Sequence, residues 1–140
     1  SLRSPAYVSL ARAGGLSVVA ITDAGQVGVD VEAEGAAEEA GVREVALHPD
    51  ERSEPRADLT RIWVRKEALL KAYGLGLAVD PADVRLDDDG TVAWDSDHPS
   101  PGAVWFRDLA VAGHVATVVV VPDAGQETDE LSVTMRTGGT

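Results

Sequence analysis

Residues 27–32 alternate between valine and a small or acidic residue, in the order Val-Gly-Val-Asp-Val-Glu. Because successive side chains of a β-strand point to opposite faces, this period of two predicts a strand with one buried face. Asp30 and Glu32 then leave the same face, with their Cα atoms roughly 7 Å apart. Two carboxylates at that separation can share a Mg²⁺ ion, above all one that also binds phosphate oxygens. Taken alone, however, the pattern is more often an acidic strand face in contact with solvent.

A second segment, residues 57–73, has the periodicity of a helix with one broad apolar face. The apolar residues of that face are Leu59, Ile62, Trp63, Leu69, Leu70 and Tyr73. Gly74 follows directly and is suited to a left-handed helix cap. The segment therefore predicts the long helix of the fold.

Glu67 and Lys71 are four residues apart in this helix, about 40° from each other around its axis, so they project together. They are either a surface ion pair or a functional pair. In the second case Glu67 is a third metal ligand or a general base, and Lys71 binds a phosphate. Lys66 lies about 140° from Lys71 and either flanks the same cleft or faces solvent. Together with Asp30 and Glu32, the helix predicts a Mg²⁺–diphosphate site between strand and helix, where electrostatic stabilisation of the leaving diphosphate would be the main catalytic effect.

The other periodic segments predict an α+β fold, with a mostly antiparallel sheet packed against one long and one or two short helices. We expect a β-hairpin over 16–32, a helix over 35–47, a first helical turn at 49–51, loops over 53–58 and 95–102, a short hairpin over 84–94, and strands over 104–111 and 114–121. Residues 1–121 are predicted to form one compact domain, since 140 residues suit a single core. The polar segment 122–140 is predicted to be a partly disordered tail.

The composition excludes several classes of function. The chain has no cysteine, so disulfides, thiolate metal sites and cysteine nucleophiles are ruled out, which fits a cytoplasmic protein. A formal charge of −12 argues against binding to nucleic acid or to an anionic membrane surface. No apolar run approaches the ~20 residues needed to span a bilayer. A small anionic ligand remains compatible, because a few local cations can reverse the field inside a cleft.

The two segments occur in an order and spacing that resemble a known family. Residues 28–32, followed about thirty residues later by 63–72 and by the glycine-containing stretch 74–77, resemble the two signature motifs of 4'-phosphopantetheinyl transferases. Residues 46–51 and 112–116 extend the resemblance more loosely. The combination is far more specific than either segment alone.

The resemblance implies an activity, that of a holo-[acyl-carrier-protein] synthase. Such enzymes transfer the 4'-phosphopantetheine arm of coenzyme A to a serine of an acyl or peptidyl carrier protein and release adenosine 3',5'-bisphosphate. By this resemblance Asp30, Glu32 and Glu67 would hold Mg²⁺ against the diphosphate. Glu67 would also draw the proton from the carrier serine, directly or through water. Lys71, and with it Lys66, would offset phosphate charge.

The chain departs from the family's pattern at one nucleotide-binding stretch. Surfactin-type members carry Ser-His-Ser before the glycines that open the first hairpin, where this chain has Ala11, Arg12 and Ala13. Arg12 either compensates, since a guanidinium suits phosphate oxygens, or is an exposed arginine on a decayed loop. Carrier proteins are usually acidic, so docking on a chain of charge −12 needs a locally basic or apolar face, to which Arg61 and Arg65 could contribute.

The second departure is length. Surfactin-type enzymes consist of two similar halves joined in one chain, whereas this chain resembles only the second half and the strand before it. One way to replace the absent half is a homo-oligomer, a dimer or trimer, as in the short holo-acyl-carrier-protein synthases. A second copy of the chain would then form the missing side of the nucleotide site. The chain could instead be a fragment or depend on a partner. A third alternative is a catalytically degenerate member that serves as a binding or assembly subunit, or one repurposed for another coenzyme A or acyl-thioester ligand.

Overall fold

The structure is a computed structural model that describes residues 7–40, 47–51, 58–74, 79–95, 103–111, 113–123 and 134–139. Its strands are β1 (Tyr7–Ala13), β2 (Leu16–Thr22), β3 (Gly25–Ala33), β4 (Val84–Leu86), β5 (Val92–Trp94), β6 (Trp105–Val111), β7 (His114–Pro122) and β8 (Thr134–Gly139). Its helices are α1 (Ala36–Ala40), α3 (Leu59–Tyr73) and the short 3₁₀ helices η1 (Pro49–Glu51) and η3 (Pro81–Asp83). The α+β class and the long helix expected from the sequence are confirmed.

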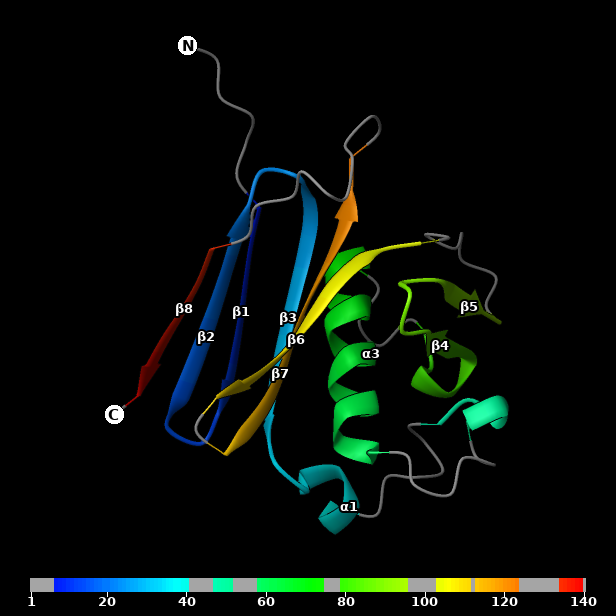
Figure 1. Ribbon diagram of the computed structural model, residues 1–140, viewed down its shortest axis with the longest axis horizontal. Coiled ribbons are helices and arrows are strands. Elements are labelled where there is room, and N and C mark those ends of the chain that lie inside the picture. Colours follow the sequence, from blue (N-terminus) through cyan, green and yellow to red (C-terminus); the bar gives the residue numbers. More distant parts are fainter. Residues whose placement is uncertain are drawn as a thin grey trace.

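The elements form three layers (Figure 1). One antiparallel sheet has the order β1-β2-β8, and a second has the order β3-β7-β6. Helix α3 and the small hairpin β4-β5 lie on the far side of the second sheet. The second sheet is therefore covered on both faces, by β1 and β2 on one and by α3 on the other.

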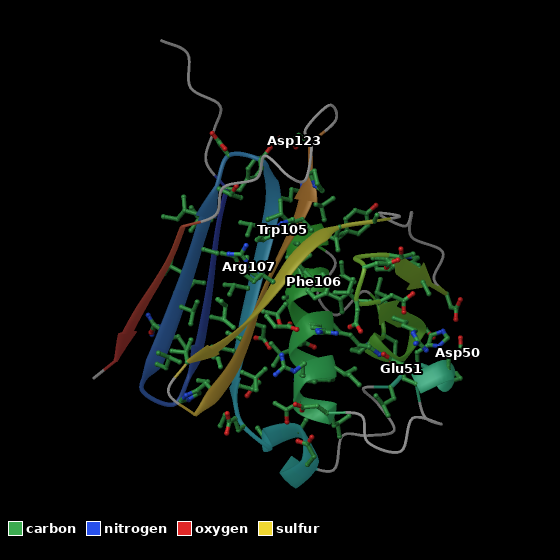
Figure 2. All side chains as sticks on the ribbon, viewed as in Figure 1. Asp50, Glu51, Trp105, Phe106, Arg107 and Asp123 are labelled. Atoms are coloured by element: carbon green, nitrogen blue, oxygen red, sulfur yellow. The ribbon has the colours of Figure 1, made fainter. Side chains whose placement is uncertain are left out.

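Helix α3 has well-defined ends and a close contact with β3. The Asp58 side chain accepts a hydrogen bond from Arg61 N at the first turn, and Gly74 caps the last turn with a φ of 74°. A Cβ atom at Gly28 would lie 2.1 Å from the carbonyl oxygen of Ala68, so only glycine lets the helix approach the strand so closely. Phe106 of β6 packs into the same layer, whereas its neighbour Trp105 packs on the opposite face of the sheet (Figure 2).

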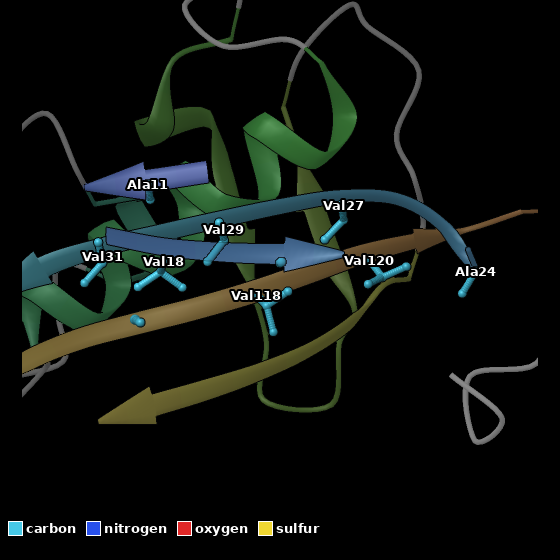
Figure 3. Close-up of a cluster of buried hydrophobic side chains, with 10 residues drawn as sticks. Ala11, Val18, Ala24, Val27, Val29, Val31, Val118 and Val120 are labelled. Atoms are coloured by element: carbon cyan, nitrogen blue, oxygen red, sulfur yellow. The ribbon is translucent and has the colours of Figure 1, made fainter. Parts of the chain in front are cut away.

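The valines of the alternating segment fill the space between the two sheets (Figure 3). Val29 and Val31 are fully buried there, beside Val18 of β2 and Val118 of β7. The strand expected over 27–32 is thus confirmed, with valines facing one sheet and the acids facing α3.

The expected β-hairpin over 16–32 is wrong in its pairing, although both of its strands exist. β2 pairs with β1 and β8, while β3 pairs with β7 in the other sheet. The chain changes sheets after Thr22, whose hydroxyl accepts a hydrogen bond from Ala24 N. The actual hairpin is β1-β2, closed at Gly14 and Gly15, a pair favoured in tight hairpin turns.

Several other expectations have mixed outcomes. The hairpin β4-β5, the strands β6 and β7, and a helical turn at 49–51 are confirmed. Of the helix expected over 35–47, α1 is present, Leu47 is not helical, and 41–46 lie outside the described residues. The loops expected over 53–58 and 95–102 fall almost entirely outside them as well. Within the segment 122–140, where no strand was expected, β8 pairs with β2. No helix in the described ranges combines the length and apolarity needed to cross a bilayer.

Candidate functional site

The predicted acids lie on the face of β3 that α3 covers. Asp30 is 9% exposed, and its register partner on β7 is the fully buried Thr117. Glu32 is half-buried one pleat further along the strand and pairs with Val115. Glu67 on α3 is also half-buried and lies close enough to Glu32 and Lys71 for their charges to affect its pKa. The strand and helix therefore bring the three predicted acids into one region.

Lys71 reaches the edge of β3 beside Asp30. Its Nζ donates to the Val29 carbonyl at 2.9 Å and lies 3.4 Å from Asp30 Oδ1. The N–H of Val29 donates to Ser9 Oγ of β1 at 3.0 Å. Val29 therefore directs both its backbone groups away from β7, and side chains of α3 and β1 satisfy them at the strand's outer edge.

The second carboxylate oxygen of Asp30 is the most unusual atom of the region. Oδ2 is buried and has no hydrogen-bond partner within the part of the chain that the structure describes. The nearby hydroxyl of Thr117 does not supply one, because it donates to Asp108 at 2.8 Å. A buried, unsatisfied carboxylate oxygen is costly unless a ligand or ion satisfies it.

The pKa values respond to this environment. Burial raises the pKa of Asp30 to about 6, with Lys71 opposing the shift and Glu32 and Glu67 adding to it. Burial also raises the pKa of Glu67, again against the influence of Lys71 and with that of Glu32. Burial is thus the main cause of both shifts, and a cation bound at these carboxylates would offset its cost.

The acids do not form a closed metal cage. Among the described residues, no group of three His, Cys, Asp or Glu side chains is arranged to hold a metal ion by itself. This geometry still fits Mg²⁺, which is usually bound by one or two carboxylates and completed by water and phosphate oxygens. The orphaned Asp30 oxygen and the hard oxygen donors around it therefore suit Mg²⁺ together with an anionic ligand.

Lys66 lies away from this region, although it neighbours Glu67 in sequence. It is 1% exposed, and its Nζ contacts Glu51 Oε1 at 2.5 Å and the Pro81 carbonyl at 3.0 Å. Burial lowers the pKa of Lys66, while Glu51 opposes that shift. Glu51 belongs to η1, on the side of α3 away from the sheets (Figure 2). The structure does not bring Lys66 together with Asp30 and Lys71.

Arg12 is exposed on the outer side of β1, between the buried Ala11 and the half-buried Ala13. This end of β1 lies beside the start of β7, since a Cβ on Gly14 would be 4.0 Å from His114 Nε2. His114 in turn pairs with Ala33, one residue past Glu32. Arg12 is therefore at the Glu32 end of the region.

Arg61 and Arg65 are engaged inside the molecule. Both guanidinium groups bind Asp108 of β6, and Arg65 also binds Asp88 and lies 5.0 Å from the ring centroid of Phe106. The two arginines join α3 to the sheet. The aspartates they bind largely neutralise their charge, so they offer little positive charge to an acidic carrier protein. The sequence reasoning missed Ser9, Thr117 and Asp108, although Thr117 is visible as a polar residue within the apolar run 115–121.

Residues 26–119 match the family described as the 4'-phosphopantetheinyl transferase superfamily. The match runs from β3 into β7 and contains Asp30, Glu32, Glu67 and Lys71, while β1, β2 and β8 lie outside it. No curated protein matches the chain significantly.

Proposed function

Since the chain belongs to the 4'-phosphopantetheinyl transferase superfamily, we propose that it transfers the 4'-phosphopantetheine arm of coenzyme A to a serine of an acyl or peptidyl carrier protein. The observation that carries the proposal is the buried Oδ2 of Asp30, which lies beside Lys71 and has no hydrogen-bond partner among the described residues. A transfer from coenzyme A needs a site for a diphosphate and its counter-ion, and this pair of groups supplies both signs of charge. The chain has no cysteine, which is compatible with the proposed cytoplasmic location.

Asp30, Glu32 and Glu67 would hold Mg²⁺, and when bound the ion would offset charge on the diphosphate and on the departing nucleotide. Lys71 Nζ lies 3.4 Å from Asp30 Oδ1, so a phosphate bound beside Asp30 would also contact the Lys71 ammonium group. Lys66, in contrast, is held by Glu51 and is left out of the proposed site.

Glu67 is the proposed proton acceptor. Its raised pKa makes it a stronger base than an ordinary surface carboxylate. In the proposed step the serine oxygen forms a bond to the phosphorus that bears the pantetheine arm. The bond from that phosphorus to the bridging oxygen breaks, adenosine 3',5'-bisphosphate leaves, and the serine proton passes to Glu67 directly or through water.

Arg12 is the proposed contact for the nucleotide phosphates, because it is exposed at the Glu32 end of the region. Among the described residues few other cations lie there, so we propose that a second copy in a homo-oligomer completes the nucleotide site. The inner face of β3-β7-β6 is already covered by β1 and β2, so the copies would meet elsewhere.

A catalytically degenerate binding subunit is the second candidate. Two observations favour it: Ala11 and Ala13 stand where the family has serines, and the acids do not form a closed metal cluster within the described ranges. Such a subunit would bind coenzyme A or another acyl thioester without transferring the arm.

Incubation of the chain with coenzyme A, Mg²⁺ and a panel of apo-carrier proteins, read by intact mass, separates the two candidates. We expect one phosphopantetheine to appear on a carrier serine, and Glu67→Gln to reduce the rate at least tenfold. Glu38→Gln is a matched control, because Glu38 bonds Thr60 near the start of α3 and takes no part in the site. Binding of coenzyme A without transfer to any carrier would favour the degenerate candidate.

A further inference from the structure

We propose that Asp108 of β6 is a positioning residue for Asp30, the proposed cation ligand two strands away, an inference that rests on the proposed function. Asp30, Thr117 and Asp108 form one row across the sheet β3-β7-β6, because Thr117 is the register partner of both aspartates. The row lies on the face that α3 covers, since the neighbouring Val29 and Val118 point into the core between the two sheets.

Thr117 has one hydroxyl proton for two neighbouring carboxylates. Opposite side chains of an antiparallel pair have their Cβ atoms roughly 4.5–5.5 Å apart, so the hydroxyl can reach a carboxylate on either side. It donates to Asp108 Oδ1 at 2.8 Å. A hydroxyl donates a single hydrogen bond, so Thr117 offers only lone pairs to Asp30. Asp30 Oδ2 is consequently left without a hydrogen-bond partner among the described residues.

Two arginines of α3 fix the direction of that hydrogen bond. Arg65 Nε lies 3.1 Å from both carboxylate oxygens of Asp108, and Arg61 Nη1 lies 3.2 Å from Oδ2. Arginine can only donate, so Asp108 is held as a charged acceptor, and Thr117 is the partner that must donate to it. The helix therefore determines, through Asp108, which carboxylate receives the Thr117 proton.

The direction of the hydrogen bond bears on cation binding. A carboxylate oxygen that already accepts a buried hydrogen bond must share or lose that bond when a cation binds. For Asp30 Oδ2 the described part of the chain supplies no such bond, so a cation relieves the full cost of burying it. Asp108 thus raises the affinity of Asp30 for a divalent cation without contacting the ion.

The test reverses the hydrogen bond with little change in the shape of the side chain. In Asp108→Asn the arginines retain the remaining oxygen, so the amide nitrogen faces Thr117 and donates to its hydroxyl oxygen. The hydroxyl proton can then turn to Asp30. Thr117→Val removes the hydroxyl, and the double variant removes it in the presence of the amide. Asp88→Asn is the matched control, because Asp88 binds the same Arg65 from a side chain that is 91% exposed.

Binding of Mn²⁺, a paramagnetic substitute for Mg²⁺, is measured from the electron paramagnetic resonance signal of the free ion, and stability from urea unfolding. We expect Asp108→Asn to bind Mn²⁺ about tenfold more weakly than the wild type, the scale of one hydrogen bond to a charged group. The double variant, Thr117→Val and Asp88→Asn should bind within about twofold of the wild type, because each lacks either the hydroxyl or the reversed bond. Asp108→Asn and the double variant should both lose stability, so a loss of affinity confined to the single variant reports the hydroxyl.

Two results overturn the inference alone. One is an unchanged affinity in Asp108→Asn. The other is an equal loss in Asp108→Asn and the double variant, which would assign the effect to the arginine contacts of α3. A wild-type chain that binds no Mn²⁺, or whose binding survives Asp30→Asn, overturns the proposed metal site and the inference with it.

Discussion

At the scale of single residues, Asp30 is a buried carboxylate whose charge is poorly compensated when no cation is bound. Its pKa is raised from 3.8 to about 6, chiefly by burial. A folded-state pKa above the unfolded value gives a stability contribution that is fully present below pH 3.8 and is lost as the pH rises through about 6. The ionised form therefore destabilises the metal-free protein at neutral pH.

Asp30→Asn should consequently stabilise the metal-free protein at pH 8. The shift from 3.8 to about 6 corresponds to about 1–3 kcal/mol, at about 1.4 kcal/mol for each pKa unit. Urea unfolding in EDTA at pH 4, 6 and 8 measures the effect as the difference between variant and wild type, which should grow across this range. Added Mg²⁺ should stabilise the wild type more than the variant. A variant that is less stable than the wild type at pH 8 would contradict the burial argument.

Gly28 is the second residue whose role depends on its neighbours. A Cβ there would lie 2.1 Å from Ala68 O and 2.4 Å from Ala72 N, and neither backbone atom can move without shifting α3. We expect Gly28→Ala to lower the free energy of unfolding by about 1–3 kcal/mol or more. Gly138→Ala is the control, since a Cβ at Gly138 meets nothing within 4 Å and should change stability by less than about 0.5 kcal/mol. Equal effects of the two substitutions in thermal unfolding would argue against the close contact.

The three acids and Lys71 could be predicted from the sequence, because the spacing within each pair matches the period of the strand or helix that carries it. The period of two placed Asp30 and Glu32 on one face, and the four-residue step aligned Glu67 with Lys71. Ser9, Thr117 and Asp108 could not be found this way. Each acts on a residue of another strand, so its role depends on which strands are neighbours, and local periodicity carries no such information.

At the scale of elements, α3 is held on two sides by its two lysines. Lys66 is 1% exposed and bound to Glu51, whereas the Lys71 side chain is 37% exposed and lies at the edge of β3. The buried pair joins η1 to the middle of the helix, one residue before Glu67. It therefore fixes the rotation of the helix that presents Glu67 to Asp30.

The two lysines should respond differently to the same substitution. Lys66→Met leaves the buried Glu51 carboxylate without its cation, with only the His48 N–H still bound to it, and should cost about 3–5 kcal/mol. Lys71→Met removes a partly exposed contact and should cost less than about 1 kcal/mol. Binding of adenosine 3',5'-bisphosphate should show the reverse order, with a large loss only for Lys71→Met. The measurements are urea unfolding and calorimetry below the melting transition.

The double variant Glu51→Leu with Lys66→Met tests the pair itself. Replacing both charges by apolar groups should restore much of the stability that Lys66→Met loses, because no buried charge is left unpaired. Ligand affinity should then equal that of the wild type. Weak ligand binding in this stable double variant would instead support Lys66 as a phosphate contact.

The strands themselves were well predicted, but their partners were not. The expected hairpin over 16–32 assumed that adjacent strands pair, as they most often do. Here the chain leaves one sheet at Thr22 and enters the other at Gly25, because β3 must present its valines to the first sheet and its acids to α3. β8 was missed because its sequence, Thr-Met-Arg-Thr-Gly-Gly, has little strand character of its own.

At the scale of the whole molecule, the exposed large apolar residues of the described part of the chain gather on the outer face of β1 and β2. Val8 and Ile21 are register partners and are 61% and 40% exposed, and Leu10 on the same face is 49% exposed. Arg12 continues this face toward the proposed nucleotide end. If a second copy completes the nucleotide site, this face is the surface on which the copies would meet.

We therefore expect the chain to associate reversibly, and to do so more strongly as salt is added. Each copy carries a charge of −12, so repulsion between copies opposes an apolar contact until salt screens it. Sedimentation velocity over a range of protein and salt concentrations measures this dependence directly. Ile21→Lys and Leu10→Lys place a charge in the contact and should shift the equilibrium to the monomer, whereas Arg107→Lys, exposed on β6, should leave it unchanged. A wild type that stays monomeric at every concentration and salt would remove the self-assembled nucleotide site and favour a partner of different sequence on this face.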